Sequence, residues 1–263
     1  MKNHETQNRE RRMFITGATS GFGEAVARLA LAAGYKLALT GRREDRLQAL
    51  QSELGDAVRY ALCFDVRNRD ETAEAIRACS SDFVPTVLVN NAGLAVGREP
   101  IDEGVYDDWD RMIDTNLKGL LNVTREWTPH MAPGSRIINI GSVAGRQAYP
   151  GGAVYNASKF AVHGLTQAMR MDLLPRGIQV AQVAPGAADT EFSLVRFKGD
   201  EAAANAVYSG YTPLSAEDVA DAVMYVATRP EHVSIQDVLI MPAAQASACL
   251  LYTSPSPRDG SES

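Results

Sequence analysis

The sequence contains few cysteines and no long apolar run. The 263 residues include three cysteines, Cys63, Cys79 and Cys249, an odd number without the spacing of metal ligands. This argues against a disulfide framework, favours a reduced cytoplasmic location, and makes a buried Cys63 beside a strand the ordinary expectation. No run approaches the roughly 20 apolar residues of a transmembrane helix, and residues 1–12 lack the apolar core of a signal peptide.

Positive charge and histidine are also scarce. The chain has 26 lysine and arginine residues against 32 aspartate and glutamate residues, a net charge of −6. This balance gives no bulk electrostatic reason for binding nucleic acid or an anionic membrane, so we predict neither partner. The four histidines, at positions 4, 130, 163 and 232, show neither metal-ligand spacing nor a nucleophilic triad, and we expect no metal site.

Short apolar runs alternate with helical stretches along the chain. The runs predicted as strands are residues 13–16, 36–40, 58–64, 86–90, 136–141, 178–183 and 238–241. The helical stretches lie between the first glycines and residue 34, and near 70–79, 106–128 and 153–174. Because uniformly apolar strands are typical of parallel sheets buried on both faces, the predicted fold class is α/β. We expect a single Rossmann-type domain over 13–246, a doubly wound parallel sheet flanked by helices.

The two ends of the chain differ from this domain. We expect the charged residues 1–12 to form a loose, disordered tail. Residues 249–259, CLLYTSPSPRD, can be encoded by a transposase-type sequencing adapter read in frame. Residues 249–263 are therefore interpreted as a non-native tail, with a natural disordered Pro/Ser-rich tail as the alternative.

A glycine-rich turn follows the first predicted strand. Thr16-Gly17-Ala18-Thr19-Ser20-Gly21-Phe22-Gly23 lies between that strand and a helix. Glycines let the backbone approach a pyrophosphate, and the N–H groups of the helix N-terminus receive its charge. The spacing is G-x3-G-x-G instead of the commoner G-x-G-x-x-G, but the strand, turn and helix together predict a dinucleotide site.

Tyr155 and Lys159 lie four residues apart in a predicted helix, and Ser142 lies thirteen residues before Tyr155. The four-residue spacing places the phenol and the ammonium on one helix face. Because a nearby ammonium favours the phenolate, we expect the pKa of Tyr155 to fall from about 10 toward neutrality. Such a tyrosine can exchange a proton with the oxygen of a substrate carbinol or carbonyl.

Further motifs accompany these two in a fixed order. They are Thr16-Gly17-x3-Gly21-x-Gly23, Asp65-Val66, Asn90-Asn91-Ala92-Gly93, Asn116, Ser142, Tyr155-x3-Lys159 and Pro185-Gly186-x3-Thr190. In this order the chain resembles the short-chain dehydrogenases/reductases over roughly residues 13–246. The resemblance implies an oxidoreductase whose nicotinamide cofactor carries the hydride while the protein manages the proton.

The resemblance also implies a role for each motif. Tyr155 would be the general acid/base, Lys159 would lower its pKa and hydrogen-bond the nicotinamide ribose, and Ser142 would orient the reacting oxygen. Asn116 would hold a water that relays protons. The cofactor-binding residues implied are Gly17, Thr19, Ser20, Gly21, Phe22, Gly23, Asp65, Val66, Asn91, Ala92, Gly93, Tyr155, Lys159, Pro185, Gly186 and Thr190.

Two arginines follow the second predicted strand. An NAD enzyme usually places an acidic residue here, about 20 residues beyond the glycines, to bind the ribose 2′-OH. Arg42 and Arg43 occupy this place, and a forked guanidinium suits a 2′-phosphate. The alternative is that both are solvated charges beside Glu44 and Asp45 at a helix start. We predict NADP as the cofactor, with Arg42 as its first ligand and Arg43 as its second.

Residues 186–216 interrupt the alternation, and we predict that they form a lid over the substrate. TEFSLVRFKGD in this lid, SVAGRQAYPGG from Ser142 onward and MPAAQAS near the last strand resemble the NADP-dependent 3-hydroxy acid dehydrogenase branch. That resemblance implies oxidation of the β-hydroxyl of serine, allo-threonine, 3-hydroxyisobutyrate or 3-hydroxypropionate, and reduction of the matching semialdehyde. Related enzymes reduce sulfoacetaldehyde.

An acid substrate needs a cation or several donors at its anionic end. Arg146 is the first candidate because it follows Ser142 by four residues and is expected to overhang the pocket. Arg196 and Lys198 on the lid are second, and Tyr149 is a candidate pocket wall or donor. Ser142 completes the predicted substrate-binding set.

Two other functions stay open at this stage. If Arg146 is a solvated loop residue, the substrate could be a neutral ketone, a diketone or a sugar-like alcohol. A noncatalytic NADP-binding sensor is the third possibility, although Tyr155 and Lys159 are both intact. The resemblance further implies a homotetramer in which the long helices near 106–128 and 153–174 form one interface.

Overall fold

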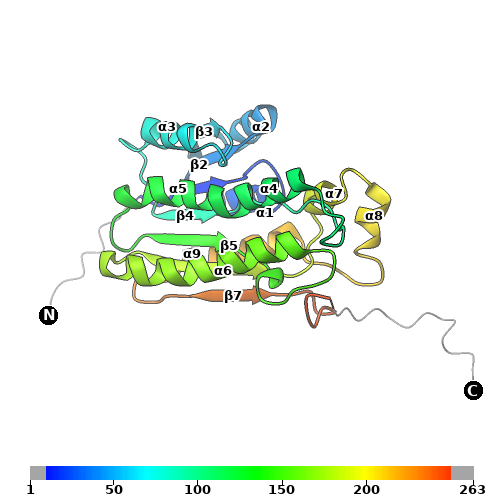
Figure 1. The fold of residues 1–263 in the computed structure, drawn as a ribbon. Helices are drawn as coiled ribbons and strands as arrows, with labels where there is room; N and C mark the ends of the chain where they lie inside the picture. The colour runs from blue at the N-terminus through cyan, green and yellow to red at the C-terminus, as the bar shows by residue number, and fades with distance from the viewer. Residues whose placement is uncertain (1–9, 250–263) are drawn as a thin grey trace, which may run out of the picture.

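Parallel strands form the central sheet of the computed structural model, which describes residues 10–249 (Figure 1). The strands are β1 (Arg12–Thr16), β2 (Lys36–Gly41), β3 (Val58–Cys63), β4 (Val87–Asn90), β5 (Arg136–Ile140), β6 (Gln179–Pro185) and β7 (Asp237–Ile240). Their order in the sheet is β3-β2-β1-β4-β5-β6-β7, and each neighbouring pair is parallel. Because the order reverses between β1 and β4, the sheet is doubly wound, as the sequence predicted.

Helices cover both faces of this sheet. One face carries α1 (Gly21–Ala32), α2 (Glu44–Leu54) and α9 (Ala216–Ala227); the other carries α3 (Arg69–Cys79), α5 (Leu120–Trp127) and α6 (Ala153–Leu173). Successive side chains of a strand point to opposite faces. In β1, Phe14 therefore packs beside Trp127 of α5, whereas Ile15 packs in the cluster formed with α1 and α9.

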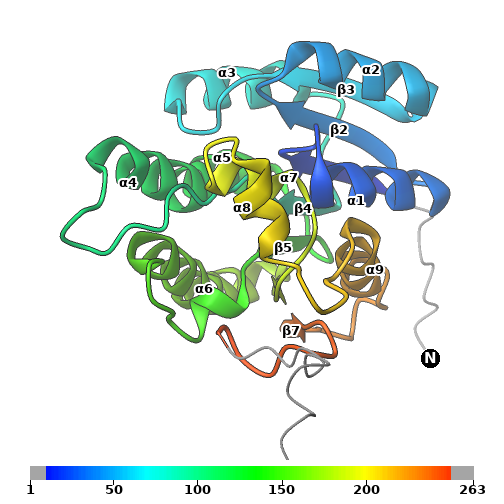
Figure 2. The ribbon, with the colours of Figure 1, turned by 90° about the vertical axis from the view of Figure 1, so that its right-hand side faces the viewer.

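The carboxyl ends of the strands meet at one edge of the sheet, which faces the viewer in Figure 2. The lid crosses this edge and contains the short helices α7 (Glu191–Arg196) and α8 (Glu201–Ala206). The glycine turn follows β1, Arg42 follows β2 and Ser142 follows β5. The parallel topology therefore brings motifs that are far apart in the sequence to the edge where doubly wound proteins bind ligands.

Two local expectations change with the structure. Cys63 is exposed, because β3 is the edge strand of the sheet; Cys79 of α3 is the buried cysteine, and burial raises its pKa to about 11. Arg12 is paired in β1, so the loose tail cannot extend to residue 12. Residues 1–9 and 250–263 lie outside the described residues, so the two predicted tails stay predictions.

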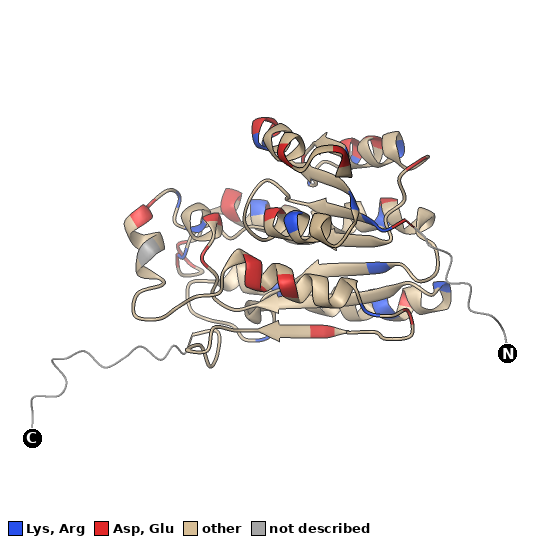
Figure 3. Ribbon diagram, turned by 180° about the vertical axis from the view of Figure 1, so that it is seen from behind, with Lys and Arg blue, Asp and Glu red and all other residues tan. Residues whose placement is uncertain are grey.

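Figure 3 shows acidic and basic residues interspersed on the helices of the face seen from behind. Within residues 10–249, no helix is both long enough and apolar enough to cross a membrane.

Candidate active site

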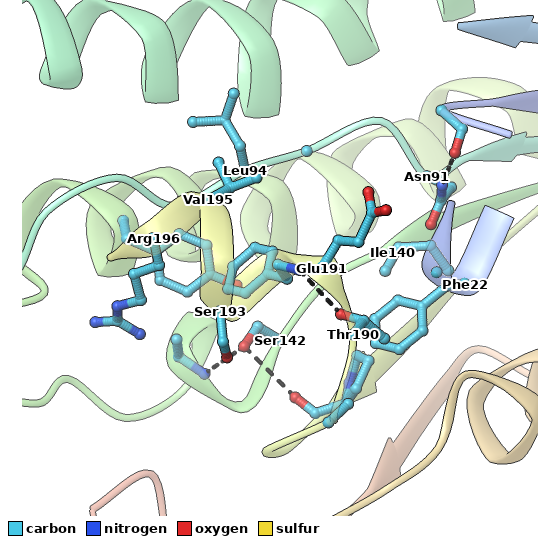
Figure 4. Close-up of a pocket in the computed structure, with 18 of the residues that line it drawn as sticks. Phe22, Asn91, Leu94, Ile140, Ser142, Thr190, Glu191, Ser193, Val195 and Arg196 are labelled. Carbon is cyan, nitrogen blue, oxygen red and sulfur yellow. Dashed lines mark hydrogen bonds between the residues drawn. The ribbon is translucent and has the colours of Figure 1, made fainter. Parts of the chain in front are cut away.

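A cavity of about 880 Å³ opens at the carboxyl ends of the strands (Figure 4). This volume falls in the range of cofactor and small-molecule sites. All of the predicted cofactor-binding residues line it except Gly23. Of the predicted catalytic residues, Ser142, Tyr155 and Lys159 line it and Asn116 does not.

The glycine turn leaves backbone open to this cavity. Gly17 has φ +66°, a conformation that favours glycine, and the Asn91 side chain donates to the carbonyl oxygens of Thr16 and Gly17 at 2.9 and 3.1 Å. A Cβ on Gly23 would lie 2.3 Å from the Gly17 oxygen, so the start of α1 packs directly on the turn. This close-packed strand, turn and helix fits the pyrophosphate of a dinucleotide.

The two arginines after β2 have different surroundings. The Arg42 side chain is 53% exposed and lies 3.9 Å from Asp65, which Arg67 already binds at 2.6 Å. Arg43 instead donates to the hydroxyl oxygen of Ser20 at 2.7 Å and turns toward the lid. A guanidinium that is half exposed at the end of β2 and makes one long ion pair fits the 2′-phosphate of NADP.

Tyr155 and Lys159 project from the first turns of α6 into the cavity, where they are 8% and 6% exposed. The Lys159 ammonium donates to the Ile140 carbonyl at 2.8 Å and lies 6.0 Å from the centre of the Tyr155 ring. Burial lowers the pKa of Lys159 to about 8.

The pKa of Tyr155 is raised in this structure, because burial outweighs every other influence on the phenol. The neighbouring Tyr149 adds to the increase, while hydrogen bonding by Ser142 and the charge of Arg196 oppose it. The predicted fall of this pKa toward neutrality is therefore wrong in this structure. A neutral phenol at pH 7 is suited to donate a proton to a carbonyl oxygen.

Asn116 lies in the π-helix η2 (Asp114–Gly119), which joins α4 (Tyr106–Ile113) to α5. Its amide exchanges two hydrogen bonds of 2.8 Å with the backbone of Leu94, and it donates to Ser158 at 3.0 Å. Ser158 in turn donates to the carbonyl oxygen of Tyr155 at 2.7 Å. Asn116 thus ties the segment after β4 to the first turn of α6, and its role in holding a water stays a prediction.

Arg146 does not lie where the sequence predicted. It follows the 3-10 turn Val143–Gly145 and forms an ion pair with Asp237 of β7, and it is not among the residues that line the cavity. The prediction that it overhangs the pocket is therefore wrong. Lys198 is also engaged elsewhere, in an ion pair of 2.7 Å with Asp108.

Arg196, at the end of α7, lies where Arg146 was expected. Its guanidinium carbon is 5.1 Å from the centre of the Tyr149 ring and 5.9 Å from that of Tyr155. By geometry, the buried Nε and Nη2 atoms of Arg196 and the hydroxyl of Tyr149 form no hydrogen bond within the described chain, although Arg196 is near enough to oppose the rise that burial causes in the pKa of Tyr149. Because buried polar groups are nearly always paired, these donors point to an anionic ligand beside Tyr155.

Other lining residues escaped the sequence analysis, among them Arg98, Tyr211 and Gln245. Gln245 accepts a hydrogen bond of 2.7 Å from the backbone N–H of Ala187 at the start of the lid. Gln245 lies in the MPAAQAS stretch, which was used only as a mark of the dehydrogenase branch, and Tyr211 lies in the predicted lid; Arg98 belongs to none of the quoted motifs. No cluster of His, Cys, Asp and Glu able to hold a metal occurs in residues 10–249.

Known proteins are similar to this chain over most of its length. The "short chain dehydrogenase" family model matches residues 11–200. Sulfoacetaldehyde reductase 2 of Chromohalobacter salexigens is 48% identical over 245 residues, with 89% of this chain and 95% of that protein covered. The NADP-dependent 3-hydroxy acid dehydrogenase YdfG of Salmonella typhi is 46% identical, with 90% and 97% covered.

A solved structure is also similar to this chain, in fold and in sequence. The closed form of serine dehydrogenase complexed with NADP+ superposes with a TM-score of 0.87 at 43% identity, covering 93% of this chain and all of that chain. The fold, the order of motifs and these similarities confirm the resemblance seen in the sequence. The chain belongs to the short chain dehydrogenase family.

Proposed function

We propose that this short chain dehydrogenase interconverts a small 3-hydroxy acid and its semialdehyde, with NADP as the cofactor. The observation that carries the proposal is Arg196, whose two buried unpaired nitrogens lie beside Tyr155. The carboxylate of such a substrate would accept hydrogen bonds from both nitrogens, while the reacting carbonyl group of the substrate lies at the Tyr155 phenol. The names of the similar dehydrogenases, and the NADP+ in the serine dehydrogenase structure, support the same substrate class and cofactor.

The chain's own residues position the substrate and move one proton. When bound, the cofactor supplies or accepts the hydride at the carbinol carbon. In reduction, the neutral phenol of Tyr155 donates its proton to the carbonyl oxygen, and the Ser142 hydroxyl holds that oxygen by a hydrogen bond. Lys159 then lies close enough for its charge to stabilise the phenolate that remains. Oxidation runs through the same groups in reverse.

Sulfoacetaldehyde is a second candidate substrate, and a specific feature of the cavity favours it. The unpaired donors are three groups, Nε and Nη2 of Arg196 and the hydroxyl of Tyr149. A sulfonate offers one oxygen to each donor, whereas a carboxylate meets all three donors only if one of its two oxygens accepts twice. A neutral ketone would leave all three donor groups unpaired, which costs about 1–3 kcal/mol for each group.

The test is the initial rate of NADPH oxidation with a panel of carbonyl compounds. Malonic semialdehyde, methylmalonic semialdehyde and sulfoacetaldehyde form the anionic arm, and two neutral ketones of similar size form the other. Serine and 3-hydroxyisobutyrate test the reverse reaction with NADP+. The proposal expects kcat/KM to be highest in the anionic arm; a higher value for the neutral ketones would overturn it.

The variant Arg196→Ala tests the anion site directly. We expect kcat/KM for anionic aldehydes to fall by about 10- to 100-fold, mainly through KM, because a charge-assisted hydrogen bond is lost. Neutral ketones should change by less than about threefold, since they do not use the guanidinium. Arg146→Ala is the matched comparison, and it should affect both classes equally and weakly. Selective loss of the anionic substrates in Arg146→Ala would contradict the geometry.

We also propose that the protein is a cytoplasmic homotetramer. Large apolar side chains are exposed on two neighbouring helices, namely Leu121 on α5 and Phe160 and Met171 on α6. A stable symmetric interface would cover them. Light scattering should give a tetramer for the native protein and a smaller species for Phe160→Glu. A native protein that is monomeric at micromolar concentration would refute the assembly.

A further inference from the structure

Glu191 begins the lid helix α7 and binds two arginines of a distant segment. One carboxylate oxygen lies 2.9 Å from Nη1 of Arg43, and the other lies 2.5 Å from Nη1 of Arg46. Arg43 is the N-cap residue of α2, and Arg46 is in the first turn of that helix. We call Arg43, Arg46 and Glu191 the lid clamp.

The lid clamp joins the lid to the glycine turn. Arg43 holds this turn through the hydroxyl of Ser20 at 2.7 Å and through Oγ1 and the carbonyl oxygen of Thr19. Thr190, next to Glu191, lies against Gly21, where an added Cβ would be in ordinary van der Waals contact with it at 3.4 Å. Both Arg43 and Glu191 line the cavity. The lid clamp therefore closes one side of the groove that fits the dinucleotide.

Every nitrogen of the Arg43 guanidinium already has a protein partner. Nε and Nη2 donate to Thr19 and Ser20, while Nη1 donates to Glu191. Arg42 differs, because it is more than half exposed and its nearest carboxylate is shared with Arg67. Arg43 is thus placed to hold the lid, whereas Arg42 is placed to bind the nucleotide.

We propose that the lid clamp retains the dinucleotide by holding the lid closed, so that Arg43 serves the lid while the 2′-phosphate is left to Arg42, its first predicted ligand. Glu191, Arg43 and Arg46 are positioning residues in this scheme, because they act through the lid. The opposite end of α7 is fastened separately, by Lys198 to Asp108 at 2.7 Å. Loss of Glu191 should therefore loosen the groove side of the lid while the far end stays attached. The inference is independent of the substrate proposed above.

The side chains of the lid clamp are partly exposed to solvent, so its ion pairs are expected to have a modest effect on the lid. The Glu191 side chain is 41% exposed, and exposed ion pairs contribute modestly to stability. Burial opposes its ionisation, but hydrogen bonds from Arg46 and Arg43 lower the pKa of Glu191 overall. The carboxylate is thus ionised at pH 7, and high salt should weaken its attraction to the arginines.

The first experiment measures release of NADPH and of NADH by stopped-flow fluorescence. Arg46→Ala and Glu191→Gln should speed the release of both nucleotides by the same factor, about three- to tenfold. Glu201→Gln, which removes one exposed carboxylate from α8 that no described group binds, is the matched control and should release both as the native protein does. Arg42→Ala should instead weaken the binding of NADPH by about 10- to 100-fold and leave the binding of NADH unchanged.

The second experiment measures opening of the lid in the absence of catalytic turnover. Trypsin cuts after Arg196 and Lys198, which both belong to the lid, so cleavage in the NADP+ complex reports its opening. We expect Glu191→Gln and Arg46→Ala to be cut there several times faster than Glu201→Gln. Binding of 2′,5′-ADP, followed by thermal shift, should be lost in Arg42→Ala and kept in Arg43→Ala.

Two results would overturn the inference. If cleavage and nucleotide release in Glu191→Gln equal those of Glu201→Gln, the clamp does not hold the lid. If Arg43→Ala loses 2′,5′-ADP as fully as Arg42→Ala, Arg43 belongs to the phosphate site and the division of tasks is wrong.

Discussion

Replacing Tyr155 by phenylalanine is expected to lower kcat by about a hundred- to ten-thousandfold while NADPH still binds. The variant removes one oxygen from a side chain that is 8% exposed, so the ring can keep its packing against Phe192 at 5.6 Å. The variant loses the proton donor that faces the reacting oxygen in the cavity. A positioned acid or base contributes about 10²- to 10⁴-fold to the reaction rate.

Turnover and binding must be measured separately for this variant. NADPH affinity, from the fluorescence of the bound nucleotide, should stay within about twofold of the native protein, whereas the rate of NADPH oxidation should be almost lost. Tyr149→Phe is the matched control, because it deletes a second buried phenol of the same cavity. It should raise KM for anionic substrates and leave most of kcat. Near-normal turnover in Tyr155→Phe would refute the proton role and revive the sensor hypothesis.

The order of the elements could be predicted from the sequence for a clear physical reason. Uniformly apolar strands, helix-period stretches and a glycine turn are local patterns, and parallel topology then fixes which ends meet. The predicted strands match the structure to within about one or two residues, as at β2 (Lys36–Gly41) and β5 (Arg136–Ile140). The motifs at the carboxyl ends of these strands accordingly line one cavity.

Side-chain direction and burial were not predictable in the same way. Position in the sequence favoured Arg146 over Arg196 as the anion ligand, but the turn before Arg146 directs it to Asp237, whereas α7 directs Arg196 toward Tyr149. The pKa of Tyr155 depends on how deeply its hydroxyl is buried, which no spacing reveals. The clamp residue Glu191 lies inside a recognised motif, yet its partners are more than 140 positions away.

Replacing Lys159 by methionine is expected to stabilise the ligand-free protein while lowering kcat by at least about a hundredfold. Lys159 is 6% exposed, and its pKa falls from 10.5 to about 8 because burial disfavours the ammonium. A shift of that size corresponds to a penalty of about 3 kcal/mol on the charged folded state. Methionine removes the penalty but also loses the hydrogen bond to Ile140, worth about 1 kcal/mol. The net gain should raise Tm by about 4–8 °C at pH 7.

The pH dependence separates this explanation from simple repacking. The unfolded chain binds more protons than the folded chain between pH 8 and 10.5, so the native protein regains stability as the pH rises through that window. The Tm advantage of Lys159→Met should thus be largest below pH 8 and shrink toward pH 10. Lys118→Met, an exposed lysine paired with Asp114, should show no such trend. If Lys159→Met has lower Tm than the native protein at pH 7, burial does not penalise the ammonium. If the variant does gain stability and loses turnover, the fold retains a costly buried charge at the place where the reaction needs it.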